Sequence, residues 1–177
     1  FHNEINISLP TGISILVTTL WIVGIVNALN WLDGIDGLAV GIMIISNFTF
    51  IIFALLKGDY TLILIICSTL GALIGFLRFN SFPSKILMGD GGSYLIAINI
   101  ALFTLTIFNL STQNNSSELI KTEIVTPLII LALPILDSIR VCLTRIRNGY
   151  YPFLPDRSHI HHKLIDYGFS EQNTVYI

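Results

Sequence analysis

The chain has 177 residues, of which 53% are hydrophobic and only 11% are charged, and its mean hydropathy is +0.78. Soluble domains carry roughly 25% charged residues, so this composition argues against a soluble domain and indicates an integral-membrane protein. The net charge of −2 and the lack of a basic stripe argue against a nucleic-acid partner.

Five apolar runs are long enough to cross a hydrocarbon core, which requires about 20 helical residues. In chain order they cover residues 11–31, 38–57, 61–79, 93–110 and 124–143. The segments between them are short, and the polar stretch 111–123 is typical of an exposed loop. We therefore predict an all-α fold, a polytopic transmembrane bundle of about five spans that forms a single domain over residues 1–177.

Lysine and arginine are unevenly divided between the two ends of these spans. Seven of the nine fall on the side that carries residues 33–36, 78–92 and everything after 140, and two fall on the other side. The positive-inside rule makes the first side cytoplasmic. Every segment with candidate chemistry lies on that side, so we expect a site that faces the cytosol.

Two amides and two carboxylates end the first apolar run: Asn27, Asn30, Asp33 and Asp36. A spacing of three places neighbours on adjacent positions of a helix. The intervening glycines then let the chain turn its carboxylates toward a common point. Oxygen ligands of this kind suit a hard cation such as Mg²⁺, which also bridges to phosphates. The alternative is a solvent-facing helix end that Asn and Asp cap.

A second polar segment lies between the third and fourth runs, from Asn80 to Ser93. Its two adjacent glycines, 91 and 92, would let backbone N–H groups approach an anion. Ser93 is expected to cap the helix that follows, whose positive end favours phosphate. Asp90 is a natural metal ligand beside such a loop. A Walker A loop is excluded, because no Gly-Lys-Ser/Thr follows the glycines, and an ordinary turn remains the alternative.

The third segment follows the last run and contains His159, His161 and His162, flanked by Arg157 and Lys163. We expect these side chains to form a cationic clamp for a diphosphate. A transition-metal site and an ordinary surface loop are the alternatives. The catalytic zinc pattern, with His at i and i+4 and an intervening Glu, is absent.

Within the last run, Pro134 is expected to kink the helix, because proline has no N–H to donate. Asp137 and Arg140 follow it, three residues apart. We interpret them as a local ion pair that eases burial, with a substrate role as the alternative.

Taken together, the three segments resemble the polyprenyl-phosphate N-acetylhexosamine-1-phosphate transferases, which form the glycosyltransferase 4 family. The resemblance covers nearly the whole chain, and three motifs in register are far more specific than one. The motifs are Asn27-Ala-Leu-Asn30-Trp-Leu-Asp33-Gly-Ile-Asp36, Met88-Gly-Asp90-Gly-Gly-Ser93 and Arg157-Ser-His159-Ile-His161-His162. The Arg-x-His-Ile-His-His pattern is similar to the branch that uses UDP-GlcNAc, whereas the UDP-MurNAc-pentapeptide branch typically has three consecutive histidines.

The resemblance implies an Mg²⁺-dependent enzyme, with Mn²⁺ as a substitute, in the inner membrane of a bacterial cell. It would transfer HexNAc-1-phosphate from a UDP-N-acetylhexosamine to undecaprenyl phosphate and release UMP. This is the first membrane step of cell-wall or surface-polysaccharide synthesis, such as that of lipopolysaccharide or teichoic acid. A homodimer is left open.

The family pattern also implies roles for individual residues. Asn30 and Asp90 would bind Mg²⁺. The remaining assignments are catalytic roles for Asp33, Asp36, Asp90, His161 and His162, and substrate binding by Asn27, Asn80, Arg157, His159 and Lys163. Attack of one phosphate on another brings two anions together, so a metal ion and cationic donors are needed to screen their charge.

Two departures from the family pattern bear on activity. Leu87 stands where the family usually has Phe, which puts an aromatic contact to the uracil in doubt. The family also carries an earlier cytoplasmic loop with two adjacent aspartates, and no such pair occurs here. Our hypothesis is that the chain is truncated at its N-terminus and also at its C-terminus, and that alone it binds Mg²⁺ weakly and catalyses nothing.

Three other functions compete with this interpretation. The pentapeptide-accepting enzyme of peptidoglycan synthesis differs in its UDP-sugar. A cation-binding membrane transporter would carry ionisable residues near the middle of its spans, whereas the acids here cluster at span ends. A structural membrane subunit would not need three polar clusters on one side.

Overall fold

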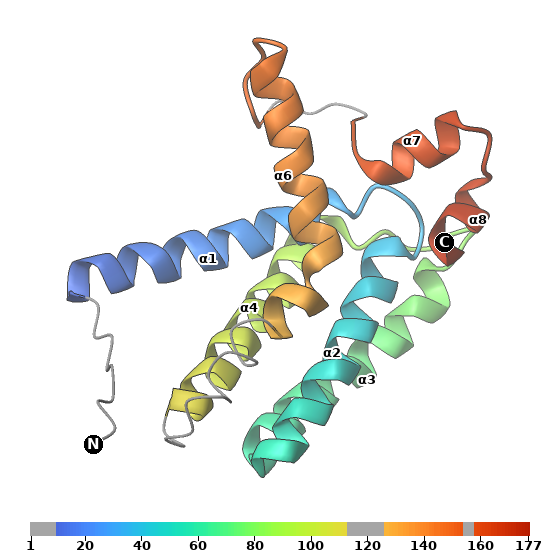
Figure 1. Ribbon diagram of the computed structural model, residues 1–177. Helices are drawn as coiled ribbons and strands as arrows, with labels where there is room; N and C mark the ends of the chain where they lie inside the picture. The colour runs from blue at the N-terminus through green and yellow to red at the C-terminus, as the bar shows by residue number, and fades with distance from the viewer. Residues whose placement is uncertain (1–9, 113–125, 154–157) are drawn as a thin grey trace.

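The computed structural model describes residues 10–112, 126–153 and 158–177, and within these ranges it contains helices and no strand. Figure 1 shows their arrangement. The elements are α1 (Thr11–Trp31), α2 (Leu38–Lys57), α3 (Tyr60–Asn80), α4 (Gly89–Thr112), α6 (Ala132–Arg147), α7 (Ile160–Asp166) and α8 (Glu171–Tyr176). The predicted all-α fold is confirmed.

Four helices in the described part of the chain are long and apolar enough to cross a membrane. They are Thr11–Trp31, Leu38–Lys57, Tyr60–Asn80 and Gly89–Ile107. The first three match the predicted spans to within one residue at each end. Their ends are defined by local chemistry: Gly58 has a φ of 71° and closes α2, and the Asp59 carboxylate accepts the Leu62 N–H at 2.9 Å and caps α3.

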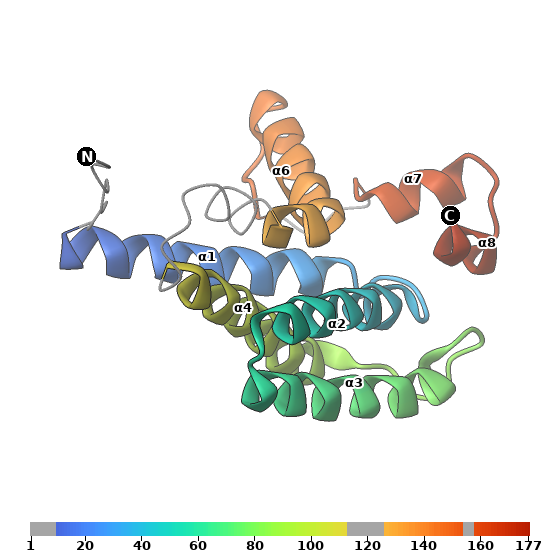
Figure 2. The same ribbon diagram turned by 60° about the horizontal axis from the view of Figure 1, so that its bottom comes forward.

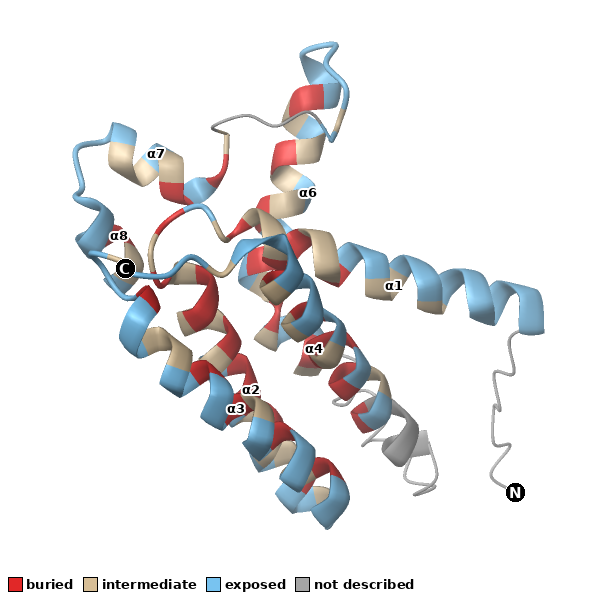
Figure 3. Cartoon of the chain, turned by 180° about the vertical axis from the view of Figure 1, so that it is seen from behind, coloured by how far each residue is buried: buried red, intermediate tan, exposed pale blue. Residues whose placement is uncertain are grey.

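The helices pack in two groups that share α4. Helix α2 packs against α3 and α4, and α1 packs against α4 and α6 (Figures 1 and 2). The core between them includes Leu29, Met43, Phe50, Ile66 and Ile100. The outward faces of α1 and α3 are exposed and apolar (Figure 3), as expected of helix faces that contact lipid.

One polar contact joins α1 to α4 inside the apolar layer. The indole Nε1–H of Trp21 donates a hydrogen bond of 2.8 Å to Thr104 Oγ1. An interhelical hydrogen bond of this kind holds membrane helices together by about 1 kcal/mol. It sets the packing of α1, the helix that carries the first polar motif.

The fifth predicted span differs from the structure. Within the described residues, a helical turn at 126–130 ends at Leu131, and α6 then runs from Ala132 to Arg147. Its 16 residues are fewer than the roughly 20 that a span needs. Pro134 accounts for the break, because it cannot donate a hydrogen bond to the preceding turn. Helix α6 therefore crosses α1 as a separate element (Figure 2).

The start of α4 also differs from the prediction. The helix begins at Gly89, four residues before the predicted start, so the two glycines at 91 and 92 lie in its first turn. Ser93 is inside the helix rather than at its cap, and its hydroxyl donates back to the Asp90 carbonyl at 3.2 Å. The unpaired N–H groups of this first turn still lie next to Asp90.

Candidate functional site

The end of α1 and the start of α4 meet through one side chain. The amide Nδ2 of Asn30 donates to Asp90 Oδ1 at 3.1 Å and to Ser93 Oγ at 2.8 Å. These contacts join the first and second predicted motifs, which are 60 residues apart in the chain. The structure therefore brings Asn30 and Asp90, the two predicted metal ligands, into direct contact.

Asp33 lies in the loop between α1 and α2, close to two other carboxylates. Burial, followed by the negative charges of Asp90 and Asp36, raises the pKa of Asp33 above its ordinary value. The predicted turn of the Asp33 and Asp36 carboxylates toward a common point is consistent with this shift. The loop thus concentrates negative charge, which a bound cation would offset.

Asp36 has a structural contact that the sequence did not indicate. Its Oδ2 accepts the backbone N–H of Ser84 at 2.8 Å, which ties the α1–α2 loop to the segment between α3 and α4. One carboxylate oxygen of Asp36 is therefore engaged with the protein.

Asn80 was predicted to bind substrate, but both ends of its amide bind backbone. It is 2% exposed. Its Oδ1 accepts the Gly37 N–H at 3.2 Å, and its Nδ2 donates to the Ile86 carbonyl at 3.0 Å. Asn80 thus holds the start of α2 against the 81–88 segment, and this geometry favours a structural role.

We expect Asn80→Ala to lower the thermal stability of the protein, because two buried backbone groups lose their partner, at a cost of about 2–4 kcal/mol. The measurement is the melting temperature in detergent, beside the Michaelis constant for the UDP-sugar. Asn80→Asp is the matched variant: it keeps the acceptor for Gly37 but sets a buried carboxylate oxygen against the Ile86 carbonyl, so it should be destabilised at least as much. A raised Michaelis constant with an unchanged melting temperature would restore the substrate role.

His161 packs directly on the α1–α2 loop. It is 1% exposed, and a Cβ built on Gly34 would lie only 2.5 Å from its Nε2. Burial, followed by the nearby His162 and His159 rings, lowers the pKa of His161 to about 4. His161 is therefore neutral at pH 7, and it cannot supply positive charge to the predicted cationic clamp.

His159 is held by a carboxylate from α6. Its Nδ1 lies 2.8 Å from Asp137 Oδ2. The other oxygen of Asp137 accepts Arg140 Nη2 at 2.7 Å and the Ile160 N–H at 3.1 Å. The predicted ion pair between Asp137 and Arg140 is confirmed, but it belongs to a larger network that orients the histidine segment.

Trp31, the last residue of α1, lies at the centre of an aromatic cluster. Its ring is 5.7 Å from the His159 ring and 6.2 Å from the Phe153 ring. The guanidinium of Arg145 is 5.7 Å from its centroid, in cation–π geometry. Arg145 also donates to the Pro152 carbonyl at 2.7 Å. Helix α1, helix α6 and the histidine segment therefore meet at Trp31.

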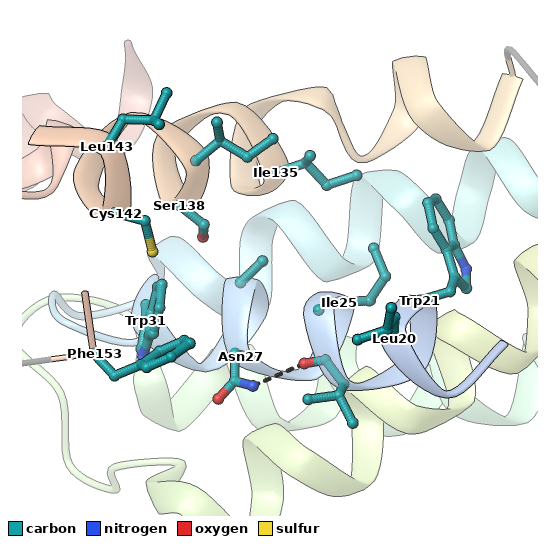
Figure 4. A pocket seen from close by; sticks show the side chains of 14 residues that line it. Leu20, Trp21, Ile25, Asn27, Trp31, Ile135, Ser138, Cys142, Leu143 and Phe153 are labelled. Carbon is teal, nitrogen blue, oxygen red and sulfur yellow. Dashed lines mark hydrogen bonds between the residues drawn. The ribbon is translucent and has the colours of Figure 1, made fainter. Parts of the chain in front are cut away.

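An apolar pocket of about 460 Å³ lies between α1 and α6, next to this cluster (Figure 4). Trp31 and Phe153 line one end of it, and its polar lining comes from Asn27 and Ser138. Asn27 donates from Nδ2 to the Val23 carbonyl at 2.9 Å. Asn27 thus lines the pocket between α1 and α6, whereas Asn30 contacts α4, so the structure does not gather all four residues of the first motif.

Two further predicted site residues, His162 and Lys163, lie on α7. The His162 ring is 4.3 Å from the His161 ring, and Lys163 is exposed on the same helix. Arg157 lies outside the described residues.

Oxygen ligands on the described residues fit a hard divalent cation. Asn30 donates through its nitrogen, so its carbonyl oxygen is left for another partner, and Asp90 is exposed. No group of three His, Cys, Asp or Glu side chains positioned to hold a metal occurs in the described ranges. Asn30 and Asp90 would therefore leave most positions to water and phosphate oxygens, as Mg²⁺ prefers; Mn²⁺ accepts similar ligands.

The sequence did not indicate three residues that shape this site. Trp31 was quoted only as part of a motif, Arg145 only as a cytoplasmic charge, and Gly34 only as a turn residue. Their importance comes from contacts between distant segments, which no local pattern reports. Helical spacing did place Asp137 beside Arg140, but nothing in the sequence pointed to His159 as its partner.

The chain is similar in sequence to several curated transferases. A probable undecaprenyl-phosphate N-acetylglucosaminyl 1-phosphate transferase from Bacillus subtilis is 38% identical over 161 residues, which are 91% of this chain and 43% of the relative. A decaprenyl-phosphate N-acetylglucosaminephosphotransferase from Mycobacterium leprae is 35% identical over 174 residues, 92% of this chain and 44% of the relative. An undecaprenyl-phosphate alpha-N-acetylglucosaminyl 1-phosphate transferase from Escherichia coli is 31% identical over 167 residues, 92% of this chain and 43% of the relative.

The chain spans less than half the length of these curated relatives. The model of glycosyl transferase family 4 matches residues 1–108, which include the Asn30–Asp90 contact and the α1–α2 loop. This match covers more than half of the chain. The chain therefore belongs to glycosyl transferase family 4.

Proposed function

We propose that this chain carries part of the site of a phosphoglycosyl transferase. The enzyme moves N-acetylglucosamine-1-phosphate, or a related HexNAc-1-phosphate, from a UDP-sugar to undecaprenyl phosphate and releases UMP. The observation that carries the proposal is the contact of Asn30 with Asp90 beside the acidic α1–α2 loop. The similarity to relatives with names of this kind supports it.

In the proposed reaction, an oxygen of the lipid phosphate attacks the β-phosphorus of the UDP-sugar. The new P–O bond joins sugar phosphate to lipid phosphate, and the bond between the α- and β-phosphates breaks, with its electron pair leaving on UMP. Asp33 and Asp36 line the acidic loop on one side of the site, and the histidine segment lies against the same loop. His159, Arg157 and Lys163 would bind phosphate oxygens, and the neutral His161 would hold the loop in place.

Asn30 and Asp90 would hold Mg²⁺ in this site. When bound, the ion screens the negative charge of the phosphates and of the nearby carboxylates. The pKa of Asp33 supports this assignment: burial and, beside it, the negative charges of Asp90 and Asp36 raise it, and a bound cation would offset those charges.

The pocket between α1 and α6 would receive the first isoprene units of the lipid. Its lining is apolar apart from Asn27 and Ser138, and Trp31 at one end lies against His159. A lipid phosphate at that end would meet the histidine segment while its chain stays in the apolar pocket. The proposed location is a bacterial plasma membrane, with the polar end of the bundle in the cytoplasm.

Bound polyprenyl phosphate should protect Cys142 from a thiol reagent, because Cys142 lines this pocket. We expect the labelling rate to fall about fivefold or more when the lipid occupies most of the sites. Cys67 is the internal control: it is exposed on α3, away from the pocket, so its rate should not change. Equal protection of both cysteines, or of neither, would contradict this placement of the lipid. Mass spectrometry of the two labelled peptides gives both rates in one experiment.

Two alternatives remain distinguishable. A transporter is disfavoured because the described carboxylates of the site lie at helix ends and in loops, not in the middle of spans. The pentapeptide-accepting branch differs only in its donor, and the histidine pattern favours UDP-GlcNAc over UDP-MurNAc-pentapeptide.

The test is UMP release by membranes that express the longest reading frame encoding this chain. UDP-GlcNAc, undecaprenyl phosphate and Mg²⁺ should together give UMP, and omission of any one should abolish release. Release with UDP-MurNAc-pentapeptide alone would move the protein to the peptidoglycan branch. Release that needs no lipid would contradict the proposed reaction.

A further inference from the structure

The Asp137 carboxylate is buried and is surrounded by hydrogen-bond donors. It is 6% exposed. It accepts His159 Nδ1 at 2.8 Å on one oxygen, and Arg140 Nη2 at 2.7 Å and the Ile160 N–H at 3.1 Å on the other. A carboxylate beside a guanidinium is ionised and has no proton to give. The proton in the contact with His159 must therefore belong to Nδ1.

The same contacts fix the orientation of the His159 ring. The ring is 6% exposed and lies between the Trp31 ring at 5.7 Å and the parallel His161 ring at 5.8 Å. Arg140 also donates to the Ser158 carbonyl at 2.5 Å, which anchors the residue before it. With Nδ1 engaged, Nε2 is the one ring nitrogen of His159 left for a ligand.

The chemistry of Nε2 depends on the charge of the ring. A neutral His159 with its proton on Nδ1 offers only a lone pair at Nε2, which repels a phosphate oxygen. The imidazolium form instead donates an N–H from Nε2, and a charge-assisted hydrogen bond to phosphate is among the stronger ones. A carboxylate that accepts the Nδ1–H of a histidine leaves Nε2 facing the ligand and offsets the positive charge of the imidazolium form.

We propose that Asp137 is a positioning residue that keeps His159 as an Nε2–H donor to the diphosphate of the UDP-sugar. This inference rests on the proposed function, because it takes the diphosphate as the ligand of His159. Carboxylate partners play the same part for histidines in other sites, where they set the tautomer and the ring orientation. Among the described residues, the charged and titratable groups at His159 are Asp137, which Arg140 also binds, from α6 and His161 from α7; on the α1 side, its contact is the uncharged Trp31.

The test is Asp137→Asn, measured as the Michaelis constant for UDP-GlcNAc at about pH 6 and about pH 8. The amide keeps the size of the carboxylate and loses its charge, so the imidazolium becomes less favourable. We expect the Michaelis constant to rise about tenfold or more at the higher pH and by less at the lower pH, where an imidazole is protonated more readily. The turnover number should change by less than about threefold.

Histidine variants separate positioning from folding. In a His159→Gln background, the further change Asp137→Asn should raise the Michaelis constant by less than about twofold, since the group it supports is gone. If Asp137 were merely structural, Asp137→Asn would lower the melting temperature and raise the Michaelis constant equally at both pH values. In the double variant, the effects of Asp137→Asn and His159→Gln on the Michaelis constant would then add. Either result would overturn the inference. If Asp137→Asn does not fold, the His159→Gln variant is measured alone. The inference predicts that its affinity for UDP no longer changes with pH in the way that the affinity of the unsubstituted protein does.

The same experiments keep this inference apart from the proposed function. UMP release by the unsubstituted protein tests the function, and the effect of Asp137→Asn on that release tests the inference. If no UMP is released, calorimetric binding of UDP at the two pH values still measures His159 and Asp137. Asp59→Asn, at the start of α3, is the matched control and should leave both measurements unchanged, because Asn also caps helices.

Discussion

Replacement of Asp90 by Asn should lower the rate of UMP release at least about 1,000-fold. The substitution keeps an oxygen that can accept the Asn30 amide, so the contact between α1 and α4 persists. What it removes is the negative charge of one of the two proposed Mg²⁺ ligands. The measurement is UMP release at saturating Mg²⁺, beside the amount of protein in the membrane fraction.

Asp59→Asn is the matched control for this prediction. It makes the same chemical change at the start of α3, on a residue that caps a helix, and Asn caps helices about as well as Asp does. Its activity should be close to that of the unsubstituted protein. Asp90→Asn with near-normal activity would remove Asp90 from the proposed metal site. A loss of membrane-inserted protein in both variants would show that the assay reports folding instead.

Replacement of Gly34 by Ala should lower activity about 100-fold, since a displacement of about 1 Å at a catalytic group costs that much. The added Cβ would lie 2.5 Å from His161 Nε2, a distance at which one of the two groups must move. Either the α1–α2 loop or α7 would shift, and with it Asp33 or the histidine segment. Gly75→Ala on α3, where no atom lies within 4 Å of the new Cβ, is the control and should be fully active.

A double variant identifies the contact responsible. Adding His161→Ala to Gly34→Ala removes the ring that the new Cβ meets. Gly34→Ala should lower the melting temperature through this clash, and the double variant should recover part of that loss, while activity stays low because the proposed role of His161 is lost. Full activity in Gly34→Ala alone would show that the loop and α7 can separate without consequence, and would contradict the packing described here.

The membrane-spanning part of the fold could be predicted because its signals are local. Each of the first three spans is an unbroken apolar run that ends at polar or glycine residues, and Gly58 and Asp59 terminate and start helices through their own backbone and side chain. The fifth predicted span is divided near Pro134, the residue that was expected to kink it. Its composition was apolar enough, but the hydrogen bond that Pro134 cannot make divides it.

The candidate site was predictable only in part, because its contacts join distant segments. Asn30 and Asp90 were predicted as metal ligands because their side chains carry oxygen, and the structure places the two side chains in contact. Helical spacing alone did not reveal that Asn27 would line the pocket between α1 and α6 while Asn30 contacts α4. The family pattern implied a substrate role for Asn80, yet its amide is used by two backbone groups.

The histidine segment shows the same limit. Its residue types indicated an exposed cationic clamp, but His159 and His161 are buried, and His161 is neutral at pH 7. Burial of these rings depends on Gly34, Trp31 and Asp137, which belong to three other segments of the chain. No pattern within residues 157–163 carries that information.

The most direct test of the account is the fate of the β-phosphate of the donor. Membranes that express the longest reading frame encoding this chain would be given undecaprenyl phosphate, Mg²⁺ and UDP-GlcNAc that carries radioactive phosphorus in its β-phosphate. The account predicts that the label moves to the lipid together with the sugar, in a one-to-one ratio with released UMP. Label that stays in UDP while the sugar alone reaches the lipid would contradict the proposed phosphosugar transfer.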